Sequence, residues 1–227
     1  MGDVFTDGKS MTSPRLTFLI VSCAAALVCG QAAAHPHVFA EAKMTLVLNA
    51  AGAVEKLTHN WVFDDLFSST VLVEFDKDQD LKLSEEELKD VQGTIVDSIG
   101  DYNYFQTISN NGADVKMARP PNLTAKMDGT TLVISFESAP EKILPLHGKV
   151  SFGIYDPTFY TAIDFVADSD LQTTGLPAGC EAKVIRPSPE EAMAQNQKNL
   201  TDSFFATTDA VSMGQLVATR LEVSCPP

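Results

Sequence analysis

The sequence is short of basic residues, and this shortage restricts its possible partners. Of its 227 residues, 16 are Lys or Arg and 30 are Asp or Glu, so the formal net charge is -14. Binding to nucleic acid requires clustered Lys and Arg that neutralise phosphates, and the composition therefore argues against it. An acidic surface suits divalent cations better, although acidity can also serve solubility alone.

Catalytic motifs are missing as well. The chain contains no Gly-x-Ser-x-Gly, no Gly-rich phosphate loop and no His-Glu-x-x-His. Residues 155–160 (Tyr-Asp-Pro-Thr-Phe-Tyr) form a dense polar and aromatic patch. Asp156 before Pro157 is typical of a turn beside packed aromatic rings, and a ligand or partner site is the alternative. We therefore expect a protein that is not an enzyme.

No hydrophobic run is long enough to predict a membrane span. The apolar run from Leu16 to Val28 follows Arg15 and precedes three alanines at 32–34. This pattern predicts a secretory signal peptide over residues 1–34 and one periplasmic domain over residues 35–227, soluble after cleavage. A lipoprotein site at Cys23 is an alternative, but it leaves a shorter apolar core. Met11 is an alternative start that gives a more basic leader.

Cysteine is scarce, and half of it lies in the predicted signal peptide. Cys180 and Cys225 remain in the exported part, which is an even number in an oxidising compartment. We predict that they form a disulfide. The alternative is that both thiols bind a soft metal, but no Cys-x-x-Cys lies near either residue.

Hydrophobic periodicity predicts strands followed by a helical pair. Apolar residues alternate over Val38–Leu48 and again over Leu57–Phe63, which indicates a β-hairpin. Residues 64–99 then predict helix, loop and helix. A capping box of Ser84 and Glu87 starts the second helix, and Gly100 ends it.

The rest of the chain has mainly strand signals, with a surface loop from Asp168 to Gly179 and a helix start at Ser188. Strands are predicted at Leu132–Phe136, Val150–Tyr155, Tyr160–Val166 and Leu216–Val223. The predicted fold class is α+β, with antiparallel β strands and an EF-hand-like helix-loop-helix inserted at 64–99.

The twelve residues from Asp76 to Glu87 have the spacing of an EF-hand calcium loop. Calcium prefers six to eight oxygen ligands. Loop positions 1, 3, 5, 7, 9 and 12 are Asp76, Asp78, Asp80, Lys82, Ser84 and Glu87. Lys82 would contribute its backbone carbonyl, and Glu87 would contribute its carboxylate. The sequence therefore predicts a calcium site, and the alternative is an acidic helix-turn-helix that binds no ion.

Leu81 departs from this motif because the sixth loop position is normally Gly. That position requires a positive φ, which costs a residue with a side chain about 1 kcal/mol or more. We expect a reduced calcium affinity for this reason. No second loop of this kind is found, so a structural site is favoured over a sensor.

Three of the four histidines are candidate transition-metal ligands. His35 and His37 flank Pro36 at the predicted mature N-terminus, where the free α-amine adds another nitrogen. His59 would join them if the first two strands pair. Imidazole suits zinc, nickel and copper. The alternative is that His59 is a packed core ring beside Trp61.

Several separated motifs together resemble a known bacterial family. They are His35-Pro36-His37-Val38-Phe39, His59-x-Trp61-x-Phe63-Asp64, the Asp-rich loop with Leu83-Ser84-x-Glu86-Glu87, residues 155–160 and Pro177-Ala178-Gly179-Cys180. The resemblance runs from His35 to about Cys180. It is to a family of periplasmic proteins of unknown function, labelled as the periplasmic component of an uncharacterised ABC-type transport system.

The resemblance implies metal handling, because the family often occurs beside nickel, cobalt or zinc transport functions. It implies no catalytic residues. We hypothesise a periplasmic metal-binding protein that is an accessory or solute-binding component of a nickel, cobalt or zinc transport system. Its partners would be metal ions, with zinc, nickel, cobalt or copper as candidates, and a membrane transporter. The alternative is a calcium-stabilised structural or interaction module without a transition-metal role.

Overall fold

The computed structural model describes residues 36–188, 190 and 217–226. These described residues belong to one compact unit. The predicted signal peptide, His35 and most of the helix expected after Ser188 lie outside the described residues. No helix in the described part of the chain is long and apolar enough to cross a membrane.

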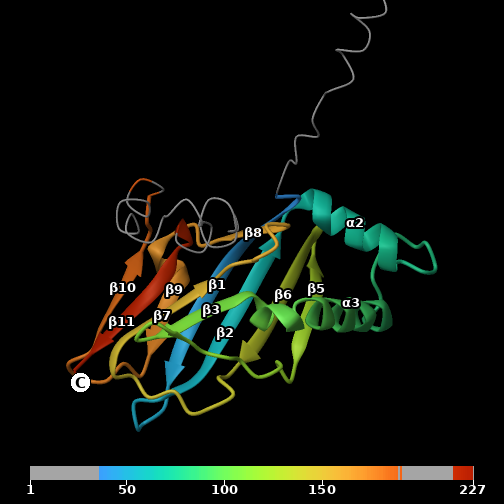
Figure 1. Ribbon diagram of the computed structural model, residues 1–227. Coiled ribbons are helices and arrows are strands. Elements are labelled where there is room, and N and C mark those ends of the chain that lie inside the picture. The colour runs from blue at the N-terminus through green and yellow to red at the C-terminus, as the bar shows by residue number, and fades with distance from the viewer. Residues whose placement is uncertain (1–35, 189, 191–216, 227) are drawn as a thin grey trace, which may run out of the picture. The chain divides into compact units, whose positions relative to one another are not determined.

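One sheet is built around the predicted hairpin (Figure 1). Its strand order is β5-β6-β2-β1-β8, and β9 also pairs with β1. The strands are β1 (Val38–Leu48), β2 (Val54–Phe63), β5 (Leu123–Asp128), β6 (Thr131–Ser138), β8 (Thr161–Asp164) and β9 (Leu171–Thr174). The predicted β1–β2 hairpin is present, and β5 and β6 form a second antiparallel hairpin.

The second sheet has the order β10-β11-β7-β3-β4. Its strands are β3 (Gln106–Asn110), β4 (Ala113–Asp114), β7 (Gly148–Ile154), β10 (Glu181–Ile185) and β11 (Arg220–Cys225). All of its pairs are antiparallel. The predicted last strand is therefore present, although it begins at Arg220 and not at Leu216.

The expectation of purely antiparallel strands was wrong for the first sheet. Strands β8 and β9 both pair with β1 in the parallel direction. The predicted surface loop 168–179 contains the short 3-10 helix η3 (Asp168–Asp170) and then β9. The only strong local signal for β9 is Leu171, which pairs with Met44 and is 6% exposed. Its other residues are polar, so the sequence pattern resembled a loop.

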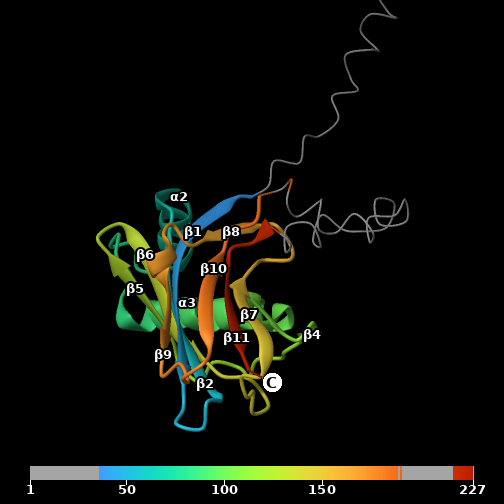
Figure 2. The same ribbon diagram turned by 90° about the vertical axis from the view of Figure 1, so that its left-hand side faces the viewer.

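The predicted helical pair consists of α2 (Asp65–Phe75) and α3 (Glu85–Ser98). Asp64 caps α2 by accepting a hydrogen bond from the Phe67 amide at 2.9 Å, and its other oxygen accepts from the Phe39 amide at 2.8 Å. The α2 terminus is thereby tied to β1. The predicted Ser84–Glu87 capping box begins α3. Both helices lie beside β5 and β6, as Figures 1 and 2 show.

The hydrophobic core lies on one face of the first sheet. Alternate residues of β1 are buried along its whole length, as the sequence predicted. One part of this face is covered by the second sheet through Ile108, Phe152 and Val223, and α2 and α3 cover another part. The two layers meet over β2, where Trp61 is 1% exposed.

The disulfide Cys180–Cys225 is present, as predicted. It joins the start of β10 to the end of β11, which are already paired at Glu181 and Ser224. The bond closes a chain segment with a sequence separation of 45. It therefore restricts the conformations of the unfolded chain.

Replacing both cysteines by Ala should lower the free energy of unfolding by about 2–4 kcal/mol, because the chain-entropy estimate for a loop of this length is about 4 kcal/mol. Urea unfolding, followed by Trp61 fluorescence, measures the loss. Reductant should destabilise the wild type by a similar amount and leave the double variant unchanged. An equal response of both proteins to reductant would contradict the prediction.

Candidate functional site

The acidic loop between α2 and α3 brings three carboxylates together. Asp76, Asp78 and Asp80 each offer one oxygen, and these oxygens lie within 4.8 Å of one another. Within the described residues, this is the group of His, Cys, Asp and Glu side chains that could hold a metal ion. The structure thus brings together the predicted ligands at loop positions 1, 3 and 5.

Backbone amides of the loop hold these carboxylates in place. The Leu81 amide donates to Asp76 Oδ2 at 2.8 Å, and the Lys82 amide donates to Asp80 Oδ1 at 2.8 Å. For Asp78, the hydrogen bond from the Asp80 amide lowers the pKa, but the nearby charge of Asp80 and desolvation raise it. The net result is a pKa above the ordinary value. A bound cation would relieve this repulsion between like charges.

Glu87, the predicted ligand at position 12, is engaged elsewhere. It is 6% exposed, and its oxygens accept hydrogen bonds from the Lys77 amide at 2.7 Å and the Ser84 amide at 2.9 Å. These two bonds, that of Ser84 first, lower the pKa of the Glu87 carboxyl. Glu87 therefore ties the start of the loop to the start of α3, and its oxygens lie outside the Asp76–Asp78–Asp80 group.

Leu81 has the backbone conformation that the sequence predicted for its position. Its φ is +64°, in the left-handed region that favours Gly, and its side chain is 77% exposed. Gln79 has a φ of +62° as well. Because the exposed Leu81 side chain gains little from packing, its strain has no evident compensation within the loop.

His59 belongs to a buried polar cluster between the two sheets. Its Nε2 lies 3.1 Å from Gln106 Oε1 and 3.2 Å from Ser138 Oγ, and its ring stacks on Phe136 with centroids 4.4 Å apart. His59 is 3% exposed, and burial lowers its pKa from 6.5 to about 3. The sequence left open the alternative that His59 is a packed core ring, and the structure shows this arrangement.

His37 lies far from this cluster. His59 pairs with Met44 on β1, and His37 precedes Met44 by seven residues, or about 20 Å of extended chain. His37 is exposed and contacts Tyr160, with ring centroids 5.4 Å apart. One ion therefore cannot bind both His37 and His59, which corrects the expected three-histidine site. His35 lies outside the described residues.

The 155–160 patch is a turn, as its sequence predicted. The buried carboxylate of Asp156 accepts hydrogen bonds from the Thr158 amide, the Thr158 hydroxyl and the Thr161 amide, all at 2.7–2.8 Å. Tyr155 and Phe159 pack edge to face, with centroids 5.6 Å apart. Asp156 is thereby fully used in holding the turn.

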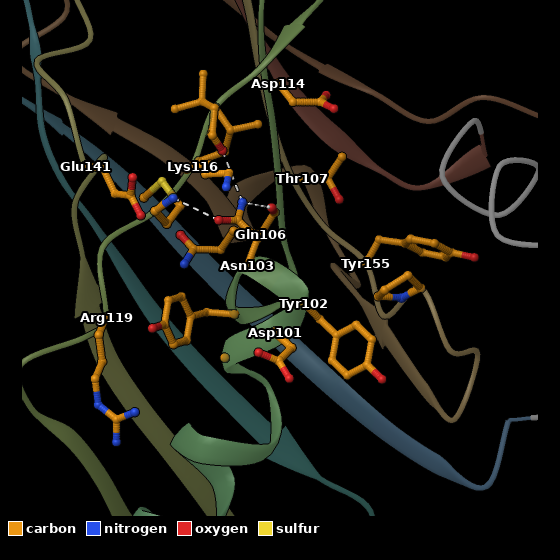
Figure 3. A pocket seen from close by; sticks show the side chains of 16 residues that line it. Asp101, Tyr102, Asn103, Gln106, Thr107, Asp114, Lys116, Arg119, Glu141 and Tyr155 are labelled. Carbon is orange, nitrogen blue, oxygen red and sulfur yellow. Dashed lines mark hydrogen bonds between the residues drawn. The ribbon is translucent and has the colours of Figure 1, made fainter.

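A strained segment that the sequence did not reveal lies beside a polar cavity of about 810 Å³ (Figure 3). Asn103, Tyr104 and Phe105 have φ values of +55°, +56° and +57°. The Asn103 amide group donates to the carbonyls of Gln106 and Val115, at 2.7 and 3.1 Å, and its oxygen accepts from the Met117 amide at 2.8 Å.

Asn is the one member of this segment that tolerates the left-handed region well, and only this residue could have suggested the turn. The charged side chains around the cavity, labelled in Figure 3, carry both signs, and they are Asp101, Asp114, Glu141, Lys116 and Arg119. The cavity therefore presents no single charge that would select a charged ligand.

The buried neutral His59 should make stability depend on pH. Below pH 6.5 the unfolded chain binds a proton at His59, whereas the folded chain does not until about pH 3. The stability contributed by the neutral ring is thus complete above pH 6.5 and is lost as the pH falls towards 3. Between about pH 7 and about pH 5.5 the wild type should lose about 1 kcal/mol from this group.

The variant His59→Gln should lose less over the same interval, and the exposed His147→Gln should behave as the wild type. Urea unfolding at the two pH values, with Trp61 fluorescence as the signal, provides the comparison. The same pH dependence in His59→Gln and wild type would rule out this role of His59.

Comparisons with known proteins give a family without a known function. A family model described as a protein of unknown function (DUF1007) matches residues 20–225. An uncharacterised protein of Haemophilus influenzae is 26% identical over 196 residues, which cover 85% of this chain and 91% of the relative. Since the family model spans nearly the whole sequence, the chain belongs to the DUF1007 family.

Proposed function

We propose that this chain is an exported calcium-binding protein, in which one calcium ion at Asp76, Asp78 and Asp80 fixes α2 relative to α3. The observation that carries the proposal is the convergence of these three carboxylates within 4.8 Å. Three like charges at this separation repel one another, and oxygen donors of this kind suit calcium. The disulfide supports an oxidising compartment such as the periplasm.

The donor set fits calcium in part. The three Asp carboxylates supply hard oxygens, and Lys82 has a backbone carbonyl at the next position of the loop spacing. Glu87 would have to exchange its hydrogen bonds with Lys77 and Ser84 for the ion. This exchange and the strain at Leu81 both favour a weak site, and a weak site is adequate where calcium is abundant.

The effect of the ion would be structural. The loop joins the end of α2 to the start of α3, and Asp64 ties α2 to β1. Holding the loop would therefore restrict the movement of α2 and α3 against the first sheet. This favours stabilisation by calcium over calcium-dependent signalling, for which no second loop is present in the sequence.

Calcium should bind to the wild type and raise its melting temperature. Asp80→Asn should weaken binding by about tenfold or more, because it removes one of three ligand charges. Leu81→Gly should strengthen binding by about fivefold, because it removes about 1 kcal/mol of strain from the loop. Isothermal titration calorimetry and thermal unfolding with and without calcium measure both effects.

The matched control is Asp128→Asn, an exposed acid in the β5–β6 turn. It should leave the affinity unchanged. Calcium binding that is equally strong in the Asp80 and Asp128 variants, or a melting temperature that calcium does not move, would refute the proposal.

The second candidate function is the accessory or solute-binding role in nickel, cobalt or zinc transport. Its support in the structure is the exposed imidazole of His37, one residue before β1. In a chain that starts at His35, the His35 imidazole and α-amine would supply the other nitrogens. His59 has no part in this version because it is buried and hydrogen-bonded within the core.

Zinc, nickel or copper should therefore bind to the protein that begins at His35, and His37→Ala should abolish binding while His59→Gln should not. Metal analysis after gel filtration and competition with a chromogenic chelator measure the stoichiometry. If the unmodified protein holds these metals only at trace level, the transport-related role is refuted and only the calcium-binding proposal remains.

A further inference from the structure

Helix α2 carries apolar side chains on two opposite sides. Phe67, Val71 and Phe75 recur every four residues, and they belong to the hydrophobic core or pack against it. Leu66 and Val73 lie seven residues apart, which places them together on the other side of the helix. Their exposed fractions are 75% and 80%. A surface helix normally turns charged residues outward, so this second apolar side of α2 lacks a cover.

We call the solvent-facing side of α2 the outer face, and it consists of Leu66, Ser69, Thr70 and Val73, all of them exposed. The two residues between the apolar ends are small and uncharged. A single exposed apolar side chain needs no explanation, but apolar side chains gathered on one surface mark a contact site.

Leu81 adds an exposed apolar side chain at the end of α2. Its amide donates to Asp76, the C-cap residue of α2, which follows Val73 by three positions. The Leu81 side chain is 77% exposed, and its φ is +64°. Gly would adopt this conformation without the cost of about 1 kcal/mol that Leu incurs. Contact with a partner would supply the packing that Leu81 lacks within the loop.

The charge around the outer face indicates what can cover it. Residues 65–86 contain seven Asp or Glu and two Lys, which places a net charge of -5 out of -14 in 22 of the 227 residues. Exposed Asp65 lies at the start of α2, and exposed Glu74 and the acidic loop lie at its end. Lys77 is paired with Asp90 of α3. A complementary surface is therefore apolar and basic.

A second copy of the chain does not have this character. Two copies that share the outer face in a symmetric contact would bring the carboxylates of one copy opposite those of the other. Like charges across an interface are unfavourable. A lipid surface with anionic headgroups attracts basic segments and would repel this acidic one. The charge therefore favours a basic segment of a different protein.

We propose that the outer face of α2, extended by Leu81, binds a short segment of another protein that presents apolar side chains flanked by Lys or Arg. The apolar side chains of the segment cover Leu66 and Val73, and its basic residues lie against the carboxylates at the two ends of α2. This proposal goes beyond the calcium and transition-metal functions and depends on neither.

Model peptides supply a partner of this chemistry. We choose three short labelled peptides: a helical Leu-Lys peptide with one apolar face, the same peptide with Glu in place of every Lys, and a Leu-Lys peptide whose order destroys the apolar face. The first should bind about tenfold more tightly than the other two, because it alone combines apolar contact with positive charge. Fluorescence anisotropy in the presence of EDTA measures the affinities without a cation in the acidic loop.

The variants Leu66→Ser and Val73→Ser should each weaken binding of the first peptide by about tenfold, because each removes an apolar contact. Leu81→Gly should weaken it by about threefold or more, although the same change should strengthen calcium binding. Ile143→Ser is the matched control, because Ile143 is 88% exposed in the connection between β6 and β7. Urea unfolding verifies that each variant is folded.

The charge requirement is tested separately. Glu74→Gln should weaken binding of the first peptide and reduce its dependence on salt, because it removes a carboxylate beside Val73. Asp128→Asn should leave both unchanged, because Asp128 lies in the β5–β6 turn.

Equal affinity for the Leu-Lys and Leu-Glu helical peptides, or equal affinity of the folded Val73→Ser and Ile143→Ser variants, would overturn the inference. Self-association of the wild type that Val73→Ser abolishes would identify a second copy as the occupant, and this result would overturn it too. Binding to phosphatidylglycerol vesicles that depends on Val73 would do the same in favour of a lipid surface. Analytical ultracentrifugation and vesicle co-sedimentation provide these two measurements.

Discussion

The structure depends on the burial of one face of the β1–β2 hairpin. Because side chains alternate along a strand, one face of this hairpin collects the apolar residues of both strands. Two different layers cover that face, the second sheet over one part and the pair α2–α3 over another. The division between these layers passes over β2, and it places His59 and Trp61 in different surroundings.

His59 and Trp61 illustrate how neighbouring positions on one strand acquire different roles. They lie two residues apart on the same face of β2, with rings 6.2 Å apart. His59 meets the second sheet, where its Nε2 lies within hydrogen-bond distance of Gln106 and Ser138, and its Nδ1 is buried without a partner among the described residues. Trp61 lies beside the helical layer, and its buried indole N–H has no acceptor among the described residues.

Two backbone regions contain residues with positive φ, namely the acidic loop and the segment 103–105. In the acidic loop, Leu81 adopts a left-handed conformation so that backbone amides can reach the carboxylates of Asp76 and Asp80. In the segment 103–105, three successive residues have a left-handed backbone, and hydrogen bonds of the Asn103 side chain hold this conformation. Phe105 lies beside Trp61. In each region a strained residue itself makes hydrogen bonds to other parts of its surroundings, the Leu81 amide to Asp76 and the Asn103 side chain to Gln106, Val115 and Met117.

The sequence pattern was sufficient to predict those elements whose residues interact with near neighbours in the chain. The β1–β2 hairpin, the capped start of α3, the position of the acidic loop and the positive φ at Leu81 all follow from periodicity, capping and turn chemistry. Residues at these sites interact with neighbours within a few positions of the chain. The pairing of Cys180 with Cys225 was also predictable, because only two cysteines follow the predicted signal peptide.

The tertiary structure decided the features that depend on distant partners. Strand β9 is stabilised by parallel pairing with β1 from far along the chain, and its own residues resemble a loop. His59 was expected beside His37, but the register of β1 and β2 separates the two residues. The Nε2 of His59 instead lies within hydrogen-bond distance of Gln106 and Ser138. The sequence by itself determined the hairpin, the helical pair and the order of the acidic residues in the loop. Only long-range packing determined which polar groups find hydrogen-bond partners in the core, because those partners come from distant parts of the chain.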